Sequence, residues 1–209
     1  DRFMVGMFYK RLQNPIEYGL LNEGQDTYYK PMNFGNATNL GVEVDIMKYF
    51  NWFGIKANYT YTHSSITTSK RIMEGNDVKS VSQTRPLFGQ AAHVANLSLL
   101  FKSTKYGWEG QIAGSYTGKR LSDISNWYND DIWEDGYMQL DASVEKSFKN
   151  GISLFAKASN LLDTPLLRFI QSGPHTESVS SERKNGNVIE RKEWHGPVSY
   201  THLRAHETG

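Results

Sequence analysis

The sequence predicts an all-β fold, an antiparallel up-and-down β-barrel that crosses a membrane. Three observations predict it. Apolar and polar side chains alternate along several segments of about ten residues. The connections between these segments are alternately long and short, and aromatic residues gather at both ends of the segments. Ten residues of a tilted strand cover the roughly 25 Å apolar band of such a barrel.

The composition fits a membrane barrel and excludes several kinds of chemistry. The chain has 209 residues, a formal net charge of +1, 13% aromatic residues and no cysteine. A net charge near zero gives no field that favours nucleic acid. The lack of cysteine excludes disulfides, thiolate zinc sites and a cysteine nucleophile. The mean hydropathy of -0.57 is ordinary for a barrel, because only every second strand residue faces lipid.

Alternation with period 2 identifies the expected strands. They cover residues 3–10, 39–48, 55–62, 93–102, 108–119, 137–148 and 152–159. In the last of them Ile152, Leu154 and Ala156 share one face, and the residues between them form a mixed face. The Asn150-Gly151 pair just before this strand is a strong hairpin signal.

The lengths of the connections favour a barrel in an outer membrane over a soluble sheet. Long polar stretches cover 11–36, 63–92, 121–135 and 166–190, whereas short turns lie near 49–54, 103–107 and 149–151. Outer-membrane barrels have short periplasmic turns and long external loops. We therefore expect the first strand to run outward and the following strands to alternate in direction.

Aromatic residues cluster where two girdles of a barrel are expected. Those near the short turns are Tyr49, Phe50, Trp52, Phe53, Tyr106, Trp108 and Phe148. Those near the opposite strand ends are Tyr9, Tyr59, Tyr61, Tyr116 and Tyr137. A single aromatic residue is ordinary in any strand, but clustering at both ends indicates two membrane interfaces.

The second face of the strands carries charges that suit water. Its charged residues are Glu43, Asp45, Lys56, Glu109, Asp141, Glu145 and Lys157. Carboxylates at these positions would be costly in a dry core. We interpret the face as a hydrated wall, with guidance of a solute as the functional alternative.

The sequence predicts no catalytic, cofactor-binding or metal site, and we expect no enzyme activity. It contains no Gly-x-Ser-x-Gly, P-loop or His-Glu-x-x-His motif. The histidines His63, His93, His175 and His195 are far apart in the chain and are expected to be solvated loop residues. We expect the acidic cluster Asp130, Asp131, Glu134 and Asp135 to form a solvated loop face, or one that bridges lipopolysaccharide through cations, because it lacks EF-hand spacing.

Several segments together resemble the C-terminal part of TonB-dependent outer-membrane receptors, in the style of Bacteroidetes-type bacteria. They are FMVGMFYKRLQNPIE, NATNLGVEVDI, IKANYTYTHSSI, RPLFGQAAHVANLSLLF, GWEGQIAGSYTGKRL and MQLDASVEKSFKNGISLFAKASNLLDTP. The resemblance covers about residues 1–196. Its most family-like parts are Asn160-Leu161-Leu162-Asp163 and the strand that contains Gly41 and Glu43.

The resemblance implies a function in active transport. It implies a barrel of the 22-stranded class with a plugged lumen, of which this chain supplies about the last seven or eight strands. The receptor would reside in the bacterial outer membrane, in contact with lipid and lipopolysaccharide. Its partners would be its own N-terminal plug domain, the TonB complex and, in some members, a surface lipoprotein, with no nucleic acid. Its solute would be an iron chelate, a cobalamin, a peptide or a glycan.

Two other functions remain open at this point. The first is a passive porin-like barrel without energy coupling, which an upstream plug domain of about 120–150 residues would contradict. The second is a soluble secreted β-sandwich that serves as a binding module. Partition of the protein into the aqueous phase without detergent would favour that second alternative.

The C-terminal residues depart from the family pattern. The string PVSYTHLRAHETG, residues 197–209, lacks apolar alternation and a terminal aromatic residue, so we expect no barrel strand there. It reads as a translated sequencing-library adapter. We therefore expect residues 1–196 to be the partial receptor barrel and 197–209 to be a non-native tail, which is set aside in fold reasoning.

Overall fold

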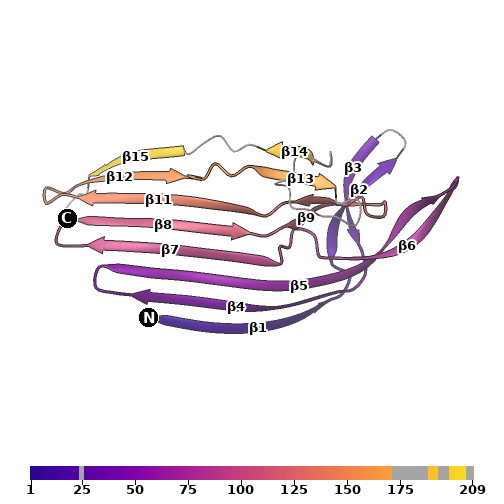
Figure 1. Cartoon of the computed structure of the whole chain (residues 1–209), viewed down its shortest axis with the longest axis horizontal. Helices are drawn as coiled ribbons and strands as arrows, with labels where there is room; N and C mark the ends of the chain where they lie inside the picture. Colours follow the sequence, from indigo (N-terminus) through magenta and orange to yellow (C-terminus); the bar gives the residue numbers. More distant parts are fainter. Residues whose placement is uncertain (24–25, 171–187, 193–197, 206–209) are drawn as a thin grey trace.

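The computed structural model of the chain describes residues 1–23, 26–170, 188–192 and 198–205 (Figure 1). All regular elements in these residues are β-strands, and they form two sheets. Within the described residues, no helix is long and apolar enough to cross a membrane. The all-β class predicted from the sequence is confirmed.

The larger sheet has nine strands and carries all the strands that alternation predicted. Its order is β1-β4-β5-β7-β8-β11-β12-β15, with β6 paired to the outer part of β5, and every pairing is antiparallel. The strands are β1 (Arg2–Leu12), β4 (Ala37–Tyr49), β5 (Phe53–Glu74), β6 (Asp77–Arg85), β7 (His93–Ser103), β8 (Trp108–Thr117), β11 (Tyr137–Ser147), β12 (Ile152–Ser159) and β15 (Val198–Ala205).

The register joins the predicted apolar residues into one continuous face, which we call the apolar face. One row across five strands consists of Ile46, Ala57, Leu97, Gly114 and Leu140. Side chains on this face are exposed in the chain by itself, and Leu97 reaches 51%. An exposed apolar surface of this extent requires a partner other than water.

The opposite face, called here the polar face, is tied together by side-chain hydrogen bonds. Asn96 Nδ2 donates to Asn58 Oδ1 at 2.8 Å between β7 and β5. Gln111 Nε2 donates to Ser98 Oγ at 3.3 Å between β8 and β7. Cross-strand polar pairs of this kind stabilise a sheet on a hydrated face.

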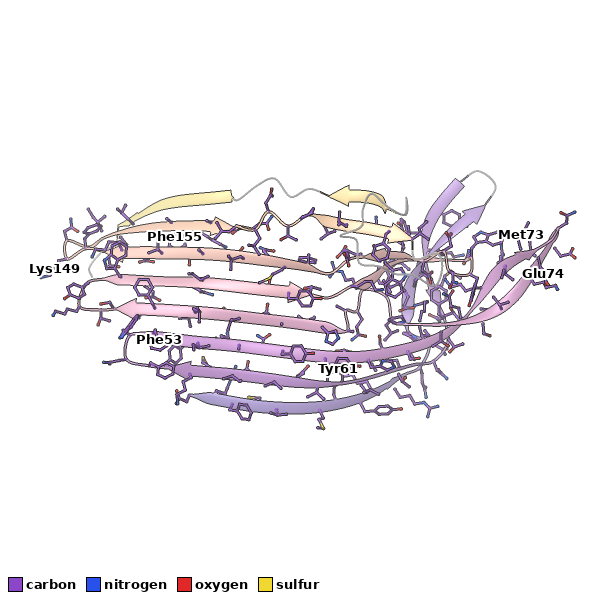
Figure 2. The ribbon with its side chains drawn as sticks, in the orientation of Figure 1. Phe53, Tyr61, Met73, Glu74, Lys149 and Phe155 are labelled. Atoms are coloured by element: carbon purple, nitrogen blue, oxygen red, sulfur yellow. The ribbon has the colours of Figure 1, made fainter. Side chains whose placement is uncertain are left out.

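The short connections lie together at one end of the sheet, on the left in Figures 1 and 2. Figure 2 labels Phe53 and Lys149 at this end. In the last of them Gly151 has a φ of 82°, a conformation that favours glycine. Asn150 Oδ1 accepts a hydrogen bond from Ile152 N at 3.3 Å. The hairpin predicted from the Asn-Gly pair is confirmed.

The Asn160-Leu161-Leu162-Asp163 segment forms a turn at the opposite end of β12. Asn160 and Asp163 have φ values of 54° and 47°, in the left-handed region that asparagine and aspartate tolerate best. Asp163 N donates to Asn160 O at 2.9 Å, and Asn160 N donates to Asp141 Oδ1 at 2.9 Å. The residue types at both ends of this segment therefore follow from its backbone geometry.

The long connections are not the loops that the sequence predicted, because they contain a second sheet. Its order is β14-β13-β10-β9-β2-β3, and β2 pairs with β9 in parallel. The strands are β2 (Ile16–Glu23), β3 (Asp26–Asn33), β9 (Arg120–Ser125), β10 (Ile132–Glu134), β13 (Leu166–Ile170) and β14 (Val188–Lys192). Figure 1 shows this sheet at the end of the larger sheet opposite the short turns.

The prediction that residues 63–92 form an irregular polar stretch was also wrong. β5 runs on to Glu74 and turns into β6, and the labels of Met73 and Glu74 mark this hairpin tip in Figure 2. Along this extension Thr62, Ser64, Ile66, Thr68 and Lys70 are buried, whereas the residues between them are more exposed. The period of 2 is present in the burial but absent from the hydropathy.

The C-terminal tail contains a strand that the sequence analysis did not expect. β15 pairs antiparallel with β12, from Ser159 opposite Val198 to Ile152 opposite Ala205. The expectation that these residues form no strand was therefore wrong. Their origin in an adapter is a separate prediction, and the nucleotide sequence decides it.

Candidate functional site

The second sheet and residues 86–92 form a folded unit that we call the cap. Residues 86–92 cross the polar face of β4 and β5. Leu87 N donates to Ser64 Oγ at 3.1 Å, and Asn39 Nδ2 donates to Gln90 Oε1 at 3.1 Å. Leu87 is also buried against Ile66. The cap therefore lies over the polar face where the long connections meet.

A buried ion pair fixes the start of this crossing segment. Arg85 Nη2 lies 2.7 Å from Glu17 Oε2, and the two side chains are only 2% and 6% exposed. Glu17 Oε1 accepts a hydrogen bond from Phe88 N at 2.7 Å. Arg85 Nη1 donates to Pro86 O at 3.0 Å, and its guanidinium lies 5.2 Å from the centre of the Phe34 ring. The pair thus connects β2, β6 and the crossing segment.

A second buried ion pair joins the extension of β5 to the loop that follows β9. Lys70 Nζ lies 2.6 Å from Asp131 Oδ1, with side-chain exposures of 1% and 3%. Lys70 also donates to Ser125 O, and Asp131 Oδ1 accepts from Ser125 N at 2.8 Å. Burial lowers the pKa of Lys70 from its ordinary value of 10.5, against the opposing effect of Asp131.

Two further ion pairs lie within the second sheet. Arg120 pairs with Glu134, and Arg168 pairs with Asp123. Asp123 and Glu134 are buried. Buried charges require partners of this kind, because an unpaired charge in a dry site is strongly unfavourable.

The interpretation of the acidic cluster as a solvated face was wrong for two of its four members. Asp131 and Glu134 are 2% and 8% exposed and are neutralised by the cations described above. Asp130 Oδ2 accepts a hydrogen bond from Ser125 Oγ at 3.0 Å. Asp135 Oδ1 accepts one from Gly136 N at 2.8 Å. The cluster therefore holds the cap together.

A polar cleft lies beside these ion pairs. It consists of two adjoining cavities of about 400 and 330 Å³ that share Thr84, Arg85, Pro86 and Trp133. The remaining lining residues are Thr62, His63, Ser64, Ser65, Gln83, Gln90, Ala92, Lys119, Asn129 and Asp131. The cleft thus offers hydroxyl and amide groups around one indole ring, although the surface of the larger cavity is mostly apolar.

One cation and one aromatic ring form the most distinctive part of the cleft. Lys119 Nζ lies 4.8 Å from the centre of the Trp133 ring and 5.9 Å from that of Phe169. Burial lowers the pKa of Lys119 from its ordinary value of 10.5. An indole face with a neighbouring ammonium group binds polar solutes by stacking and hydrogen bonding.

The described histidines do not converge on a metal site. His63 lines the cleft, while His93 Nδ1 lies 2.7 Å from the hydroxyl of Tyr59. Among the described residues no group of three histidine or carboxylate side chains is placed to hold a metal ion. His175 and His195 lie outside the described residues.

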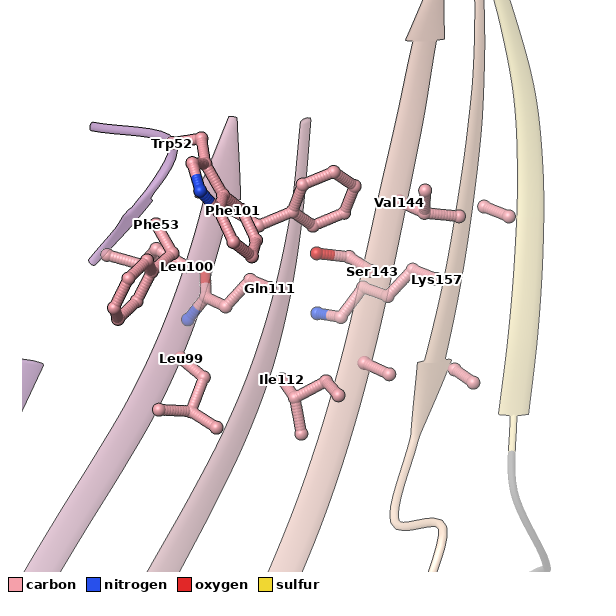
Figure 3. Close-up of a pocket in the computed structure, with 13 residues that line it drawn as sticks. Trp52, Phe53, Leu99, Leu100, Phe101, Gln111, Ile112, Ser143, Val144 and Lys157 are labelled. Atoms are coloured by element: carbon pink, nitrogen blue, oxygen red, sulfur yellow. The ribbon is translucent and has the colours of Figure 1, made fainter. Parts of the chain in front are cut away.

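A second concavity lies on the apolar face, near the short turns. It is a groove of about 680 Å³, shown in Figure 3, and almost all of its surface is apolar. Its lining residues are Trp52, Phe53, Leu99, Leu100, Phe101, Gln111, Ile112, Ala142, Ser143, Val144, Ala156, Lys157 and Ala158.

Comparison with known proteins identifies the family. A family model described as TonB dependent receptor-like, beta-barrel, matches residues 1–161. The chain belongs to this family. Neither a curated protein nor a solved structure gives a significant match. The family resemblance predicted from the sequence is thereby confirmed over β1 to β12, including the strands β2, β3, β9 and β10 of the cap.

Membership in the TonB-dependent receptor family places the chain with outer-membrane receptors and transporters. In that setting the apolar face corresponds to the lipid-facing side of the barrel, and the polar face corresponds to its lumen. The polar cleft lies beside the cap, at the end of the larger sheet opposite the short turns. No residue of this cleft was predicted from the sequence to bind a ligand, because the lining residues come from five separate segments of the chain.

Proposed function

We propose that the chain is the C-terminal part of an active importer of a scarce solute in a bacterial outer membrane. The observation that carries this proposal is the cap, which is folded over the polar face and leaves a defined polar cleft beside it. A passive pore requires an open path, whereas a receptor benefits from a preformed site that excludes bulk water. The buried ion pairs of Lys70 and Arg85 hold the cap in place.

The proposed solute contacts lie around Trp133 and Lys119. The face of the indole ring away from Lys119 supplies a stacking surface, and the Lys119 ammonium group, which lies over the ring, attracts an acidic or hydroxyl-rich group. Hydroxyl and amide groups of Thr84, Gln83 and Asn129 supply further hydrogen bonds. An iron chelate, a cobalamin, a peptide and a glycan all carry groups of this kind.

The larger sheet is open, and this supports a longer receptor. β1 and β15 are the two ends of its strand order, and within the described residues neither pairs with a further strand. Sheet edges cannot face hydrocarbon, so a membrane barrel needs additional strands between them. We propose that these strands and a plug domain belong to the same receptor, and that the TonB complex supplies energy through the plug.

The experiment that tests this function measures uptake by cells that carry the complete receptor gene. A panel of radiolabelled ferric siderophores, cobalamin, oligopeptides and oligosaccharides is offered at limiting concentration, with and without a protonophore. The proposal expects uptake of one class that ceases when the protonophore is added. Uptake that continues unchanged would instead support a passive porin.

A matched pair of variants tests the cleft. Trp133→Ala removes the stacking surface at the cap, whereas Phe3→Ala removes an exposed aromatic side chain near the opposite end of the larger sheet, which is 69% exposed and lines neither the cleft nor the groove. Loss of a stacking contact is expected to weaken uptake at limiting solute by roughly tenfold. An equal effect of both variants would contradict solute binding in the cleft but not the proposed import function.

A further inference from the structure

The apolar groove combines small and bulky side chains. Ala142, Ala156 and Ala158 on β11 and β12 leave a low floor. Phe101 on β7 lies over Gly110 on β8, where an added Cβ atom would approach the Phe101 ring to 2.6 Å. Trp52, Phe53, Leu99 and Phe101 thus stand on one side of the floor (Figure 3).

Most of the groove lies away from the edges of the sheet. Its strands β7, β8 and β11 are each paired on both sides, whereas β12 pairs with β11 and with β15, which belongs to the tail that we expect to be non-native. The groove therefore keeps its floor when further strands complete the barrel. Strand pairing on both sides also holds its width, because neighbouring strands are fixed about 4.8 Å apart.

A cation stands at the end of the groove that is closest to the short turns. Val144 lines the groove, and Lys146 is the next residue of β11 on the same face. Lys146 Nζ lies 4.8 Å from the centre of the Trp108 ring and 5.7 Å from that of Phe148. It also donates a hydrogen bond to Tyr106 O. The ammonium group is therefore held at the aromatic girdle.

We propose that this groove binds one acyl chain of a phospholipid, with the phosphate of the same molecule at Lys146. The apolar groove takes hydrocarbon, and the ammonium group at its end complements an anionic headgroup. The short turns face the periplasm in a barrel of this family, so the lipid belongs to the periplasmic leaflet. The proposal rests on the membrane location in the proposed function.

Other occupants fit the groove less well. The exposed surface of the groove is almost wholly apolar, so it suits the polar groups of a peptide or a glycan poorly. A second copy of the chain would bury a flat area with a polar rim, whereas Lys146 lies at one end of this groove. Lipopolysaccharide occupies the opposite leaflet, beyond the reach of Lys146.

The test measures phospholipid retained by the complete receptor after extraction and extensive washing in detergent. Receptor reconstituted with phosphatidylglycerol is purified again, and bound lipid is counted by native mass spectrometry. Ala156→Phe fills the floor of the groove. Ala57→Phe is the matched control, because Ala57 lies on the same face in a row that does not line the groove.

The proposal expects one retained phosphatidylglycerol in the wild type and in Ala57→Phe, and none in Ala156→Phe. Lys146→Gln is expected to weaken retention about tenfold, the effect of one charge-assisted contact. Heat-modifiable migration on gels confirms that each variant still folds. Equal retention by Ala156→Phe and the wild type, no retained lipid in the wild type, or a dimer in place of bound lipid would overturn the proposal.

The outcome is separable from the proposed import function. If phosphatidylglycerol does not bind but protonophore-sensitive uptake persists, only the lipid site is wrong. If the complete receptor does not enter the membrane at all, both proposals fail.

Discussion

The ion pair between Lys70 and Asp131 should act as the main latch of the cap. Asp131→Ala leaves the Lys70 ammonium buried, with Ser125 O as its remaining hydrogen-bond acceptor. Removing one partner of a buried pair costs about 3–5 kcal/mol, because the other charge stays uncompensated. While Lys70 keeps its proton, only local opening of the cap relieves this penalty, so the cost should appear as easier opening.

Hydrogen exchange of the complete receptor in detergent measures this opening. Each 1.36 kcal/mol changes an equilibrium tenfold, so amides of residues 121–135 should exchange about a hundredfold faster or more in Asp131→Ala. The amide of Ser125 should respond most directly, since it donates to Asp131 Oδ1. Amides of the larger sheet should keep their protection, because β8 and β11 are paired independently of the cap.

Two control variants test whether the buried Lys70–Asp131 pair itself keeps the cap closed. Lys70→Met combined with Asp131→Leu removes both charges and should restore most of the protection. Lys79→Met breaks an exposed pair with Glu74, with side chains 58% and 67% exposed, and should change opening by less than about 1 kcal/mol. If Asp131→Ala exchanges within threefold of the wild type, or if the double variant is as open as the single one, the latch does not exist.

The pKa of Lys70 gives the latch a pH dependence with a defined sign. Burial lowers this pKa in the folded cap below its ordinary value of 10.5, and loss of Asp131 removes the group that opposes the shift. The charged form then destabilises the folded cap at pH values below the folded pKa. The loss of cap stability in Asp131→Ala relative to the wild type should therefore become smaller as the pH rises through that lowered pKa towards 10.5. Limited proteolysis of the variant and the wild type at increasing pH measures this difference in cap stability.

Three further predictions concern single positions. Gly41→Val should destabilise the receptor by about 1–3 kcal/mol in urea unfolding. A Cβ atom at this position meets Tyr61 O and approaches Phe8 Cζ to 2.5 Å. An unchanged unfolding midpoint would contradict this close packing. Asn160→Val should cost about 1–3 kcal/mol while Asn160→Gly stays near the wild type, since φ is 54°; equal stabilities would exclude backbone strain. Lys119 should react with an amine reagent at lower pH than an exposed lysine, because burial lowers its pKa; peptide mapping checks the order of labelling.

The membrane strands were predictable because lipid imposes a simple pattern. One face of each strand must be apolar, so alternation in the sequence marks the strands and their faces together. Gly41 lies on the polar face instead, where the neighbouring Phe8 ring occupies the place of its missing side chain. Turn chemistry located the hairpin at Asn150-Gly151 for an equally local reason.

The cap was not predictable, because its strands are buried by polar contacts. Thr68 and Lys70 are buried on β5, yet neither is apolar, so hydropathy shows no period there. Pro31 argued against a strand, but β3 is an edge of the second sheet, where proline is tolerated. The partners Lys70 and Asp131 lie 61 residues apart, and nothing local in the sequence connects them. The one available signal was the presence of charged residues, Lys70 and Arg85 among them, in a stretch rich in serine and threonine.

The central claim is that the apolar face of the larger sheet meets lipid and the polar face meets water. The chain has no cysteine, so single spin labels are easily placed at residues 96–99 of β7 in the complete receptor in liposomes. Labels at Leu97 and Leu99 should collide with oxygen dissolved in the bilayer, and labels at Asn96 and Ser98 with a water-soluble nickel complex. Accessibility without alternation, or with the two faces reversed, would contradict the barrel.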